Sequence, residues 1–176
     1  MKVKKNSFSE LDIHHLRVAE GWLGQGNLKA RAEMDKIRAE LRSHPDVLEI
    51  LWKSYANEAN WGICLDIARA ITIEEPGRVS GWIHLAHSAR WMSGGTAQIA
   101  YDILLSAINK IPEQAAYFCD LARYACQLDR LEEARQWLEK AFRVDNSAEF
   151  LKKAFEDPDL KKLRGNYIVN NFKDRP

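Results

Sequence analysis

Residues 115–146 read AAYFCDLARYACQLDRLEEARQWLEKAFRVDN, and this stretch decides the fold. Apolar residues spaced at i, i+3, i+4 and i+7 form a single stripe along a helix. The stretch contains two such stripes separated by a short break, carried by Phe118, Leu121, Ala122 and Ala125, and then by Ala134, Leu138, Ala141 and Asn146. It therefore predicts two amphipathic helices joined by a turn.

The preceding block repeats this pattern position by position, apart from two extra residues around Ser93, Gly94 and Gly95. Its matching residues are Trp82, Leu85, Ala86 and Ala89, then Ala100, Leu104, Ala107 and Pro112. A looser third copy is about three residues short and contains Trp52, Tyr55, Ala56 and Ala59, then Cys64, Ala68, Ile71 and Pro76. Self-similarity at a fixed period is the signature of a repeat architecture, in which neighbouring units share one core.

Small residues recur where the two helices of each predicted pair must approach closely. These residues are Ala86 and Ala122 in the first helices and Ala100 and Ala134 in the second helices. Pro76 and Pro112 close their blocks, because proline is tolerated in a first helical turn but not in a helix interior. We expect large side chains at the alanine positions to push the helices apart.

The two ends of the chain depart from the repeat. Val18, Ala19, Trp22, Gly26 and Leu28 fit a first helix and turn, but the following helix, with Ala30, Met34, Ile37 and Leu41, is out of register by about one residue. This is typical of a degenerate capping repeat. Ser147 is a predicted N-cap for a ninth helix with an apolar stripe of Phe150, Leu151, Ala154 and Phe155.

The predicted organisation is one all-α domain. The domain covers residues 11–164, between a tail at 1–10 and a docked tail at 165–176. Within the domain we expect four repeats and a capping helix, at about 11–44, 45–78, 79–114, 115–146 and 147–164. The 176 residues carry 26 Lys and Arg against 25 Asp and Glu, with the signs interspersed, so nucleic acid is not an expected partner. No apolar run approaches the ~18 residues that a membrane span needs, and we expect a cytoplasmic protein.

Few residues indicate chemistry. His84 and His87 lie three apart on one helix without a further ligand at helical spacing, and His14 and His15 point to different parts of a helix surface. Cys64, Cys119 and Cys126 form no C-x-x-C pair; Arg123 stands between the last two, but reduced, buried thiols are the simpler interpretation. We expect no cofactor and no bound metal, and a metal- or thiol-dependent enzyme remains a remote alternative.

The repeat resembles the tetratricopeptide repeat over roughly residues 11–146, although Ala89 and Ala125 replace a usually bulky residue. The resemblance implies a right-handed α-α solenoid of about four helix pairs plus a C-terminal capping helix. It also implies that first helices line a concave groove. The family's groove positions fall on Ile83, His87, Arg90 and Trp91 in one block, on Cys119, Arg123, Cys126 and Gln127 in the next, and on Lys53 and Asn57 in the looser copy.

Such a basic, aromatic wall would suit a carboxylate-bearing protein partner, since Arg binds carboxylates through a two-pronged fork. The alternative is that these charges only solvate a helix face, and the paired Lys and Asn of the family's carboxylate clamp are not clearly reproduced. The chain also resembles the kinesin-light-chain-like bacterial proteins associated with tubulin-like filaments. That resemblance implies a cytoskeletal scaffold or adaptor. A rival hypothesis is docking on a membrane or assembly surface, for which Lys2, Lys4 and Lys5 alone are too short a cluster.

Overall fold

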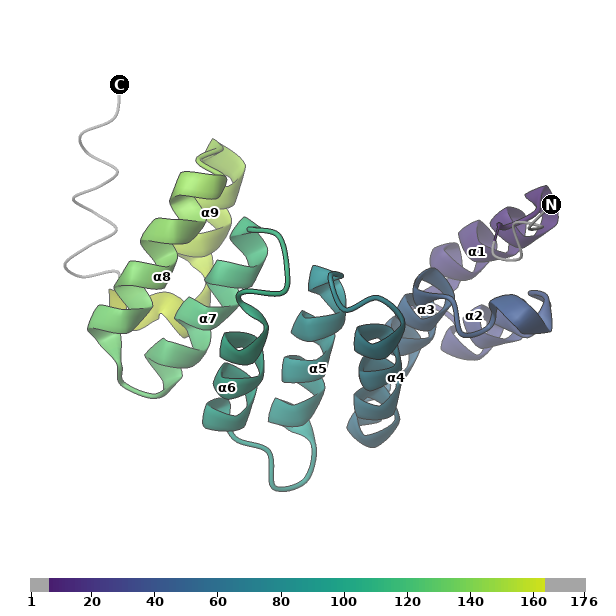
Figure 1. Ribbon diagram of the computed structural model, residues 1–176, viewed down its shortest axis with the longest axis horizontal. Coiled ribbons are helices and arrows are strands. Elements are labelled where there is room, and N and C mark those ends of the chain that lie inside the picture. The colour runs from purple at the N-terminus through teal and green to yellow at the C-terminus, as the bar shows by residue number, and fades with distance from the viewer. Residues whose placement is uncertain (1–6, 164–176) are drawn as a thin grey trace. The chain divides into compact units, whose positions relative to one another are not determined.

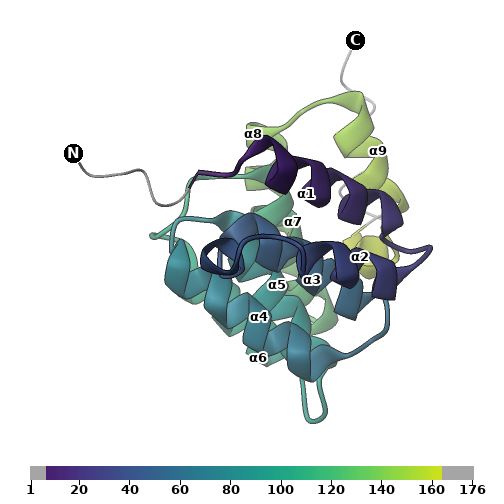
Figure 2. The same cartoon turned by 90° about the vertical axis from the view of Figure 1, so that its right-hand side faces the viewer.

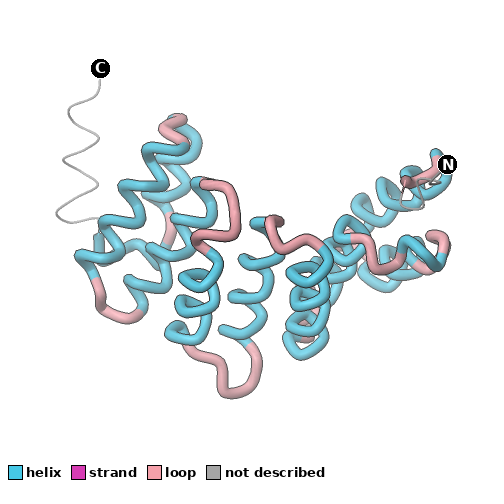
Figure 3. The backbone as a smooth tube through the Cα atoms, viewed as in Figure 1, coloured by secondary structure: helices cyan, strands magenta, loops and turns pink. Residues whose placement is uncertain are grey.

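The computed structural model describes residues 7–163, and every regular element in that range is helical (Figures 1 and 3). The order is α1 (Glu10–Trp22), α2 (Asn27–Met34), η1 (Ala39–Leu41), α3 (Pro45–Ala56), α4 (Trp61–Glu74), α5 (Val79–Trp91), α6 (Ala97–Ala107), α7 (Ala115–Gln127), α8 (Leu131–Val144), α9 (Ala148–Glu156) and η2 (Pro158–Leu163). The predicted all-α class is confirmed. The tail predicted at 165–176 lies outside the described residues.

The chain forms two compact units that meet in sequence between Met92 and Ser93. This boundary falls in the loop between α5 and α6, where Gly94 has φ 77°. The left-handed backbone conformation at Gly94 suits a residue without a Cβ. The block predicted at 79–114 is therefore divided, with its first helix in the first unit and its second helix in the second. Each unit is described by itself below.

A capping box starts the first unit. The backbone amide of Ser9 donates to Asp12 Oδ2 at 2.8 Å, and Ser9 Oγ accepts from the amide of Asp12 at 3.2 Å. Arg38 Nε also donates to Asp12 Oδ2, at 2.9 Å, so one buried carboxylate joins the start of α1 to the chain just before η1. The Ser9 hydroxyl also donates to Asp12 Oδ2, at 2.6 Å, and this hydrogen bond is the largest of those that hold the pKa of Asp12 well below its usual range.

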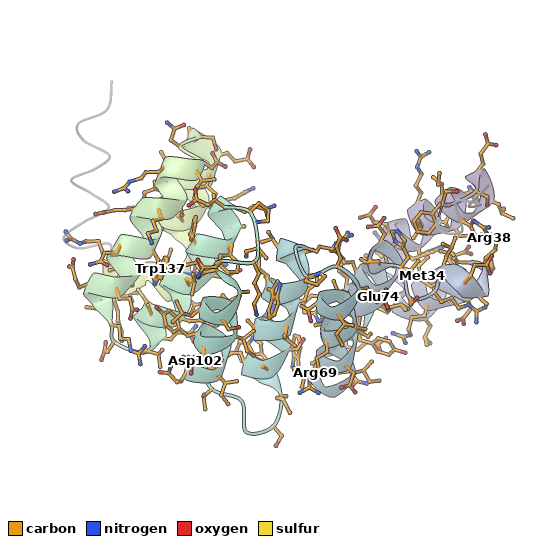
Figure 4. The ribbon with its side chains drawn as sticks, viewed as in Figure 1. Met34, Arg38, Arg69, Glu74, Asp102 and Trp137 are labelled. Atoms are coloured by element: carbon orange, nitrogen blue, oxygen red, sulfur yellow. The ribbon has the colours of Figure 1, made fainter. Side chains whose placement is uncertain are left out.

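The first pair is shorter than the sequence predicted, because α2 ends at Met34 instead of continuing through Ile37 and Leu41. Asp12 Oδ1 accepts from the amide of Arg38 at 3.4 Å, which diverts the chain from helical geometry. Ile37 and Leu41 are nevertheless buried in the same core as Met34, which explains their shift in register. Figure 2 faces α1 and α2, and Figure 4 shows Met34 and Arg38 among their side chains.

The predicted close-approach positions are buried. The second helices contribute three triads that are fully buried: Cys64, Ala68 and Ile71; Ala100, Leu104 and Ala107; and Ala134, Leu138 and Ala141. Ala86 and Ala122 of the first helices are buried to the same degree. In the first unit α5 approaches α4 so closely that a Cβ on Gly81 would lie 2.7 Å from Ile71 Cγ2. Small residues therefore set the spacing of the helices, as the sequence predicted.

The second unit is built on α7 and α8, with α6 beside α7. Trp137, labelled in Figure 4, stacks on Phe118 at 6.0 Å between ring centroids and donates its Nε1 hydrogen to the Tyr101 hydroxyl at 2.9 Å. Ser147 Oγ accepts from the amide of Phe150 at 3.2 Å and begins α9, which confirms the predicted N-cap. After α9 the chain enters η2, which packs against α7, α8 and α9.

Candidate functional site

Trp52 of α3 is the first unusual feature of the first unit. It precedes Cys64 by the same twelve residues that separate Ala122 from Ala134, so an indole stands at the position of a close-approach alanine. This resolves the register of the looser repeat: its first helix starts at Pro45, and Trp52, not Ala56, is the equivalent of Ala122. The indole is 7% exposed and donates from Nε1 to Ser88 Oγ of α5 at 2.9 Å.

Around Trp52 lies a set of five rings that we call the aromatic face: Trp52, Trp61, His84, His87 and Trp91. The His84 ring stacks on Trp52 with centroids 3.8 Å apart. His87 lies 5.9 Å from Trp52 and 5.5 Å from Trp61, and Trp61 lies 6.5 Å from Trp91. The exposure of the rings ranges from that of Trp52, which is buried, to that of Trp91, which is 54% exposed. The aromatic face thus has a packed base and a rim open to solvent.

Basic side chains border this face. The Arg90 guanidinium lies 5.1 Å from the centroid of the Trp91 ring, within cation–π range. Lys53 lies 3.7 Å from Glu20 in a pair that is exposed and therefore weak. Asn57 donates to Asn27 Oδ1 at 3.2 Å, and Ile83 is partly buried one turn before His87 on α5. Lys53 is thus a residue of α3 with Asn57 as the C-cap of that helix, and Ile83, His87, Arg90 and Trp91 are residues of α5 in the same unit.

An ion-pair network that the sequence analysis missed fixes α5 against α3 and α4. Arg78 pairs with Asp46 at 2.6 Å, Glu49 at 2.7 Å and Glu75 at 3.0 Å. Ser80 also donates to Glu49. Arg78 immediately precedes α5, so these contacts locate the start of the helix that presents His87 and Trp91. Glu75 lies three residues before Arg78, but Asp46 and Glu49 lie about thirty residues away in sequence, and no local pattern signals their pairing with Arg78.

The histidines of the aromatic face do not form a metal site. Burial against Trp52 lowers the pKa of His84 to about 4, so its imidazole is neutral at pH 7. Its Nε2 finds no hydrogen-bond partner among the described residues. Residues 7–163 hold no group of three His, Cys, Asp or Glu side chains placed to bind an ion. Both imidazoles contribute ring contacts to the aromatic face.

In the second unit, the predicted groove position Arg123 of α7 is paired with carboxylates of the same unit. Arg123 pairs with Asp120 at 2.5 Å and, through Nε, with Asp157 Oδ2 at 2.5 Å. Cys119 and Cys126 are 3% and 1% exposed, whereas Gln127 is exposed. Burial raises the pKa of Asp120, and Arg123 opposes that rise. Arg123 is thus already engaged by two carboxylates of its own unit.

The three cysteines are free thiols, and all three are buried. Burial raises the pKa of Cys64, Cys119 and Cys126 to about 11 in each case. The Cys64 thiol donates to the backbone oxygen of Trp52 at 3.6 Å. A nucleophilic cysteine requires a lowered pKa and access to solvent, and these three have neither.

These observations define the class of protein: an all-α fold of tetratricopeptide type, built from paired helices that nest through small residues. No model of a known protein family matches the chain. No curated protein matches it either. Among solved structures, the chain is similar to one titled "MamA MSR-1 C2", a protein with tetratricopeptide repeats, at TM-score 0.56 and 16% sequence identity, over 79% of this chain and 78% of that one.

That similarity confirms the fold class predicted from the repeats, an α-solenoid of tetratricopeptide type. Among the described residues, no helix has both the length and the apolar character needed to span a membrane.

Proposed function

We propose that this chain is an adaptor rather than an enzyme, and that the aromatic face with Lys53 and Arg90 binds a carboxylate-bearing segment of a partner protein. One observation carries the proposal: the Trp91 ring is 54% exposed, beside the Arg90 guanidinium and at the rim of a packed aromatic base. Tryptophan and arginine are the residues most enriched among the energetic hot spots of interfaces.

The charges of this face favour an acidic partner. Lys53 lies on α3 and Arg90 on α5, two of the three helices that form the face, and Glu49 of α3 is already paired with Arg78. The pair between Lys53 and Glu20 is exposed, so a partner carboxylate can replace Glu20 at little cost. Solvation of a helix face explains the two cations, but it does not explain a half-exposed indole stacked on other rings.

The proposal is tested by reversing the two charges together, in the variant Lys53→Glu with Arg90→Glu. The matched control is Arg69→Glu, which makes the same change on the exposed surface of α4, where Arg69 pairs only with Asp66 in the ion pairs described. Each protein is immobilised and exposed to lysate, and the captured proteins are identified by mass spectrometry. Thermal unfolding of all three proteins is recorded in parallel.

The expected result is that a partner captured by the wild type and by Arg69→Glu is lost from the double variant, while the melting temperature is unchanged. The wild-type interaction should also weaken as salt is raised, because exposed charge pairs are screened. Equal capture by the double variant and the wild type would place the binding surface elsewhere and overturn the proposal.

The resemblance to kinesin-light-chain-like proteins adds the hypothesis that the partner is a bacterial tubulin-like filament, in the cytoplasm. Co-sedimentation with the polymer at moderate salt tests this hypothesis, and a chain that stays wholly in the supernatant refutes it. The rival hypothesis of membrane docking predicts co-sedimentation with anionic vesicles instead. In both assays the variant Lys53→Glu with Arg90→Glu shows whether the aromatic face is involved.

A further inference from the structure

The chain after α9 lies on the face of α7 that the repeat pattern assigns to a groove. We call residues Asp157–Leu163 the closing segment; η2 forms most of it. Asp157 is 9% exposed and accepts from Arg123, while Leu160 and Leu163 are 0% and 6% exposed. The segment therefore binds α7 as a peptide ligand would, with one carboxylate anchor and two leucine anchors.

The contacts of the closing segment have the pattern of specific recognition. Arg123 donates through Nε to Asp157 and through Nη1 to Asp120, so its guanidinium is held between a carboxylate of α7 and one of the segment. Lys162 donates to Asp129, in the turn after α7, at 2.6 Å. Asp157 Oδ1 accepts from the amide of Asp159 at 2.9 Å, which orders the bend. Charge-assisted bonds thus flank the buried Leu160 on both sides.

Both thiols of α7 lie beneath this segment. Besides burial, the charge of Asp157 raises the pKa of Cys119. Besides burial, the charges of Asp157 and Asp159 raise the pKa of Cys126, and the charge of Lys162 lowers it. Both thiols are buried, whereas Gln127, the neighbouring groove position, is exposed. The reactivity of the two thiols therefore reports whether the closing segment is bound to α7.

We propose that the face of α7 centred on Arg123 is a peptide-binding site whose resident occupant is the closing segment, and that an outside peptide of the same chemistry can replace it. The required chemistry is an acidic residue followed three positions later by leucine, as in Asp157 and Leu160. While the closing segment is bound, the site is shut to partners, so the contact is autoinhibitory. This site is separate from the aromatic face, and its failure would leave the proposed function untouched.

The first test measures the rate at which a maleimide labels each cysteine in the folded, full-length chain, resolved by peptide mass spectrometry. Asp157→Asn removes the charge on the anchor, and Asp159→Asn is the matched control, since the same change two residues away falls on an exposed side chain. Labelling of a buried group follows the population of the open form. Loss of a hydrogen bond between charged groups should raise the labelling rates of Cys119 and Cys126 about tenfold in Asp157→Asn.

Cys64, in the first unit, is the internal control, because it is buried and distant in sequence from the closing segment. Its labelling rate should stay at the wild-type value in both variants. Leu160→Ala provides an independent route to the same release, by removing the apolar anchor. Equal labelling of Cys126 in Asp157→Asn, Leu160→Ala and wild type would overturn the proposal. So would a loss of α7 and α8 helix content that accompanies the labelling.

The second test supplies the ligand in trans. A synthetic peptide with the sequence of residues 156–163, EDPDLKKL, is added in excess to Asp157→Asn. It should return the labelling of Cys126 towards the wild-type rate, whereas a scrambled peptide should not. If neither peptide protects Cys126, the closing segment is a structural cap without a replaceable site, and the proposal fails.

Discussion

The first helices α3 and α7 occupy the same place in the repeat, yet they present opposite surfaces. On α3 the close-approach position is Trp52, whose indole reaches α5 and forms the base of an exposed aromatic face. On α7 that position is Ala122, and the neighbouring groove positions are covered by the closing segment. One repeat pattern therefore yields an open surface in one unit and a self-occupied surface in the other.

This difference teaches that the repeat determines the backbone, while a few side chains determine what each surface can bind. Small residues on α4, Cys64 and Ala68, are buried in one cluster with Trp52 and leave room for its indole. Ala122 is instead a small buried residue of α7, which packs on α8, where Ala134 and Ala141 are buried as well.

Trp52→Ala should destabilise the first unit by about 3–5 kcal/mol, because it removes a large buried side chain and leaves a cavity. It should also remove the hydrogen bond that Ser88 Oγ accepts from the indole and the ring on which His84 stacks. Urea unfolding followed by circular dichroism measures the effect. A loss below about 1 kcal/mol would show that the indole is not a core element.

Ala122→Leu is the reciprocal change and should destabilise the second unit by about 2 kcal/mol, because overpacking a buried position forces the helices apart. The same urea titration applies, with Ala116→Leu as the control, since Ala116 is an exposed residue of the same helix. Equal unfolding free energies for Ala122→Leu and Ala116→Leu would show that the surfaces of α3 and α7 do not differ by packing.

His84 should make the first unit sensitive to acid. Its folded pKa, about 4, lies below the ordinary value of 6.5, so between these values the unfolded chain binds more protons than the folded chain. Stability contributed by neutral His84 is therefore present above pH 6.5 and is lost as pH falls towards 4. The loss between pH 7.5 and pH 5 should be about 2 kcal/mol.

The measurement is the difference in unfolding free energy between pH 7.5 and pH 5, for wild type and for His84→Gln. Subtracting the two pH responses removes contributions from carboxylates such as Glu49 that also titrate on acidification. An identical response in both proteins would show that His84 is accessible to protons in the folded state.

Trp91→Ala should have the smallest effect on stability, within about 0.5 kcal/mol, because the ring is more than half exposed. The same protein should lose partner capture if the aromatic face is the binding surface. Thermal unfolding and capture from lysate are measured side by side. A large drop in melting temperature would assign Trp91 to the core instead.

The regular part of this architecture was predictable because periodicity reports burial directly. The alanines and leucines of the repeat stripes in α5 to α8 are buried where their spacing placed them, except for Leu85, which is partly buried. The register of α3 was not predictable, since Trp52 is a large residue at a position where the other copies have alanine. The early end of α2 was missed for a different reason: Ile37 and Leu41 are buried without being helical continuations of α2.

The candidate sites were predictable only in part. Carrying over groove positions placed Arg90 and Trp91 beside each other on an exposed surface. The same resemblance implied Arg123 as a donor for a partner, and the sequence predicted a capping helix through residue 164, whereas α9 ends at Glu156. The docking of the closing segment on Arg123 was not predictable, because a contact between α7 and a segment 34 residues away leaves no periodic trace. The pairs of Arg78 with Asp46 and Glu49 were missed for the same reason.

The hydrogen bonds between Asp12 and Arg38 lie in the helix pair that we expect to unfold first within the first unit. Its first helix pair includes a second helix of only eight residues, and it is joined to η1 by charged hydrogen bonds at a partly solvated site. Short helices held by solvated bonds open at low free energy. Amide hydrogen exchange should therefore be fastest in α1 and α2 and slowest in the α3–α4 pair, so that the chain frays from its beginning inward.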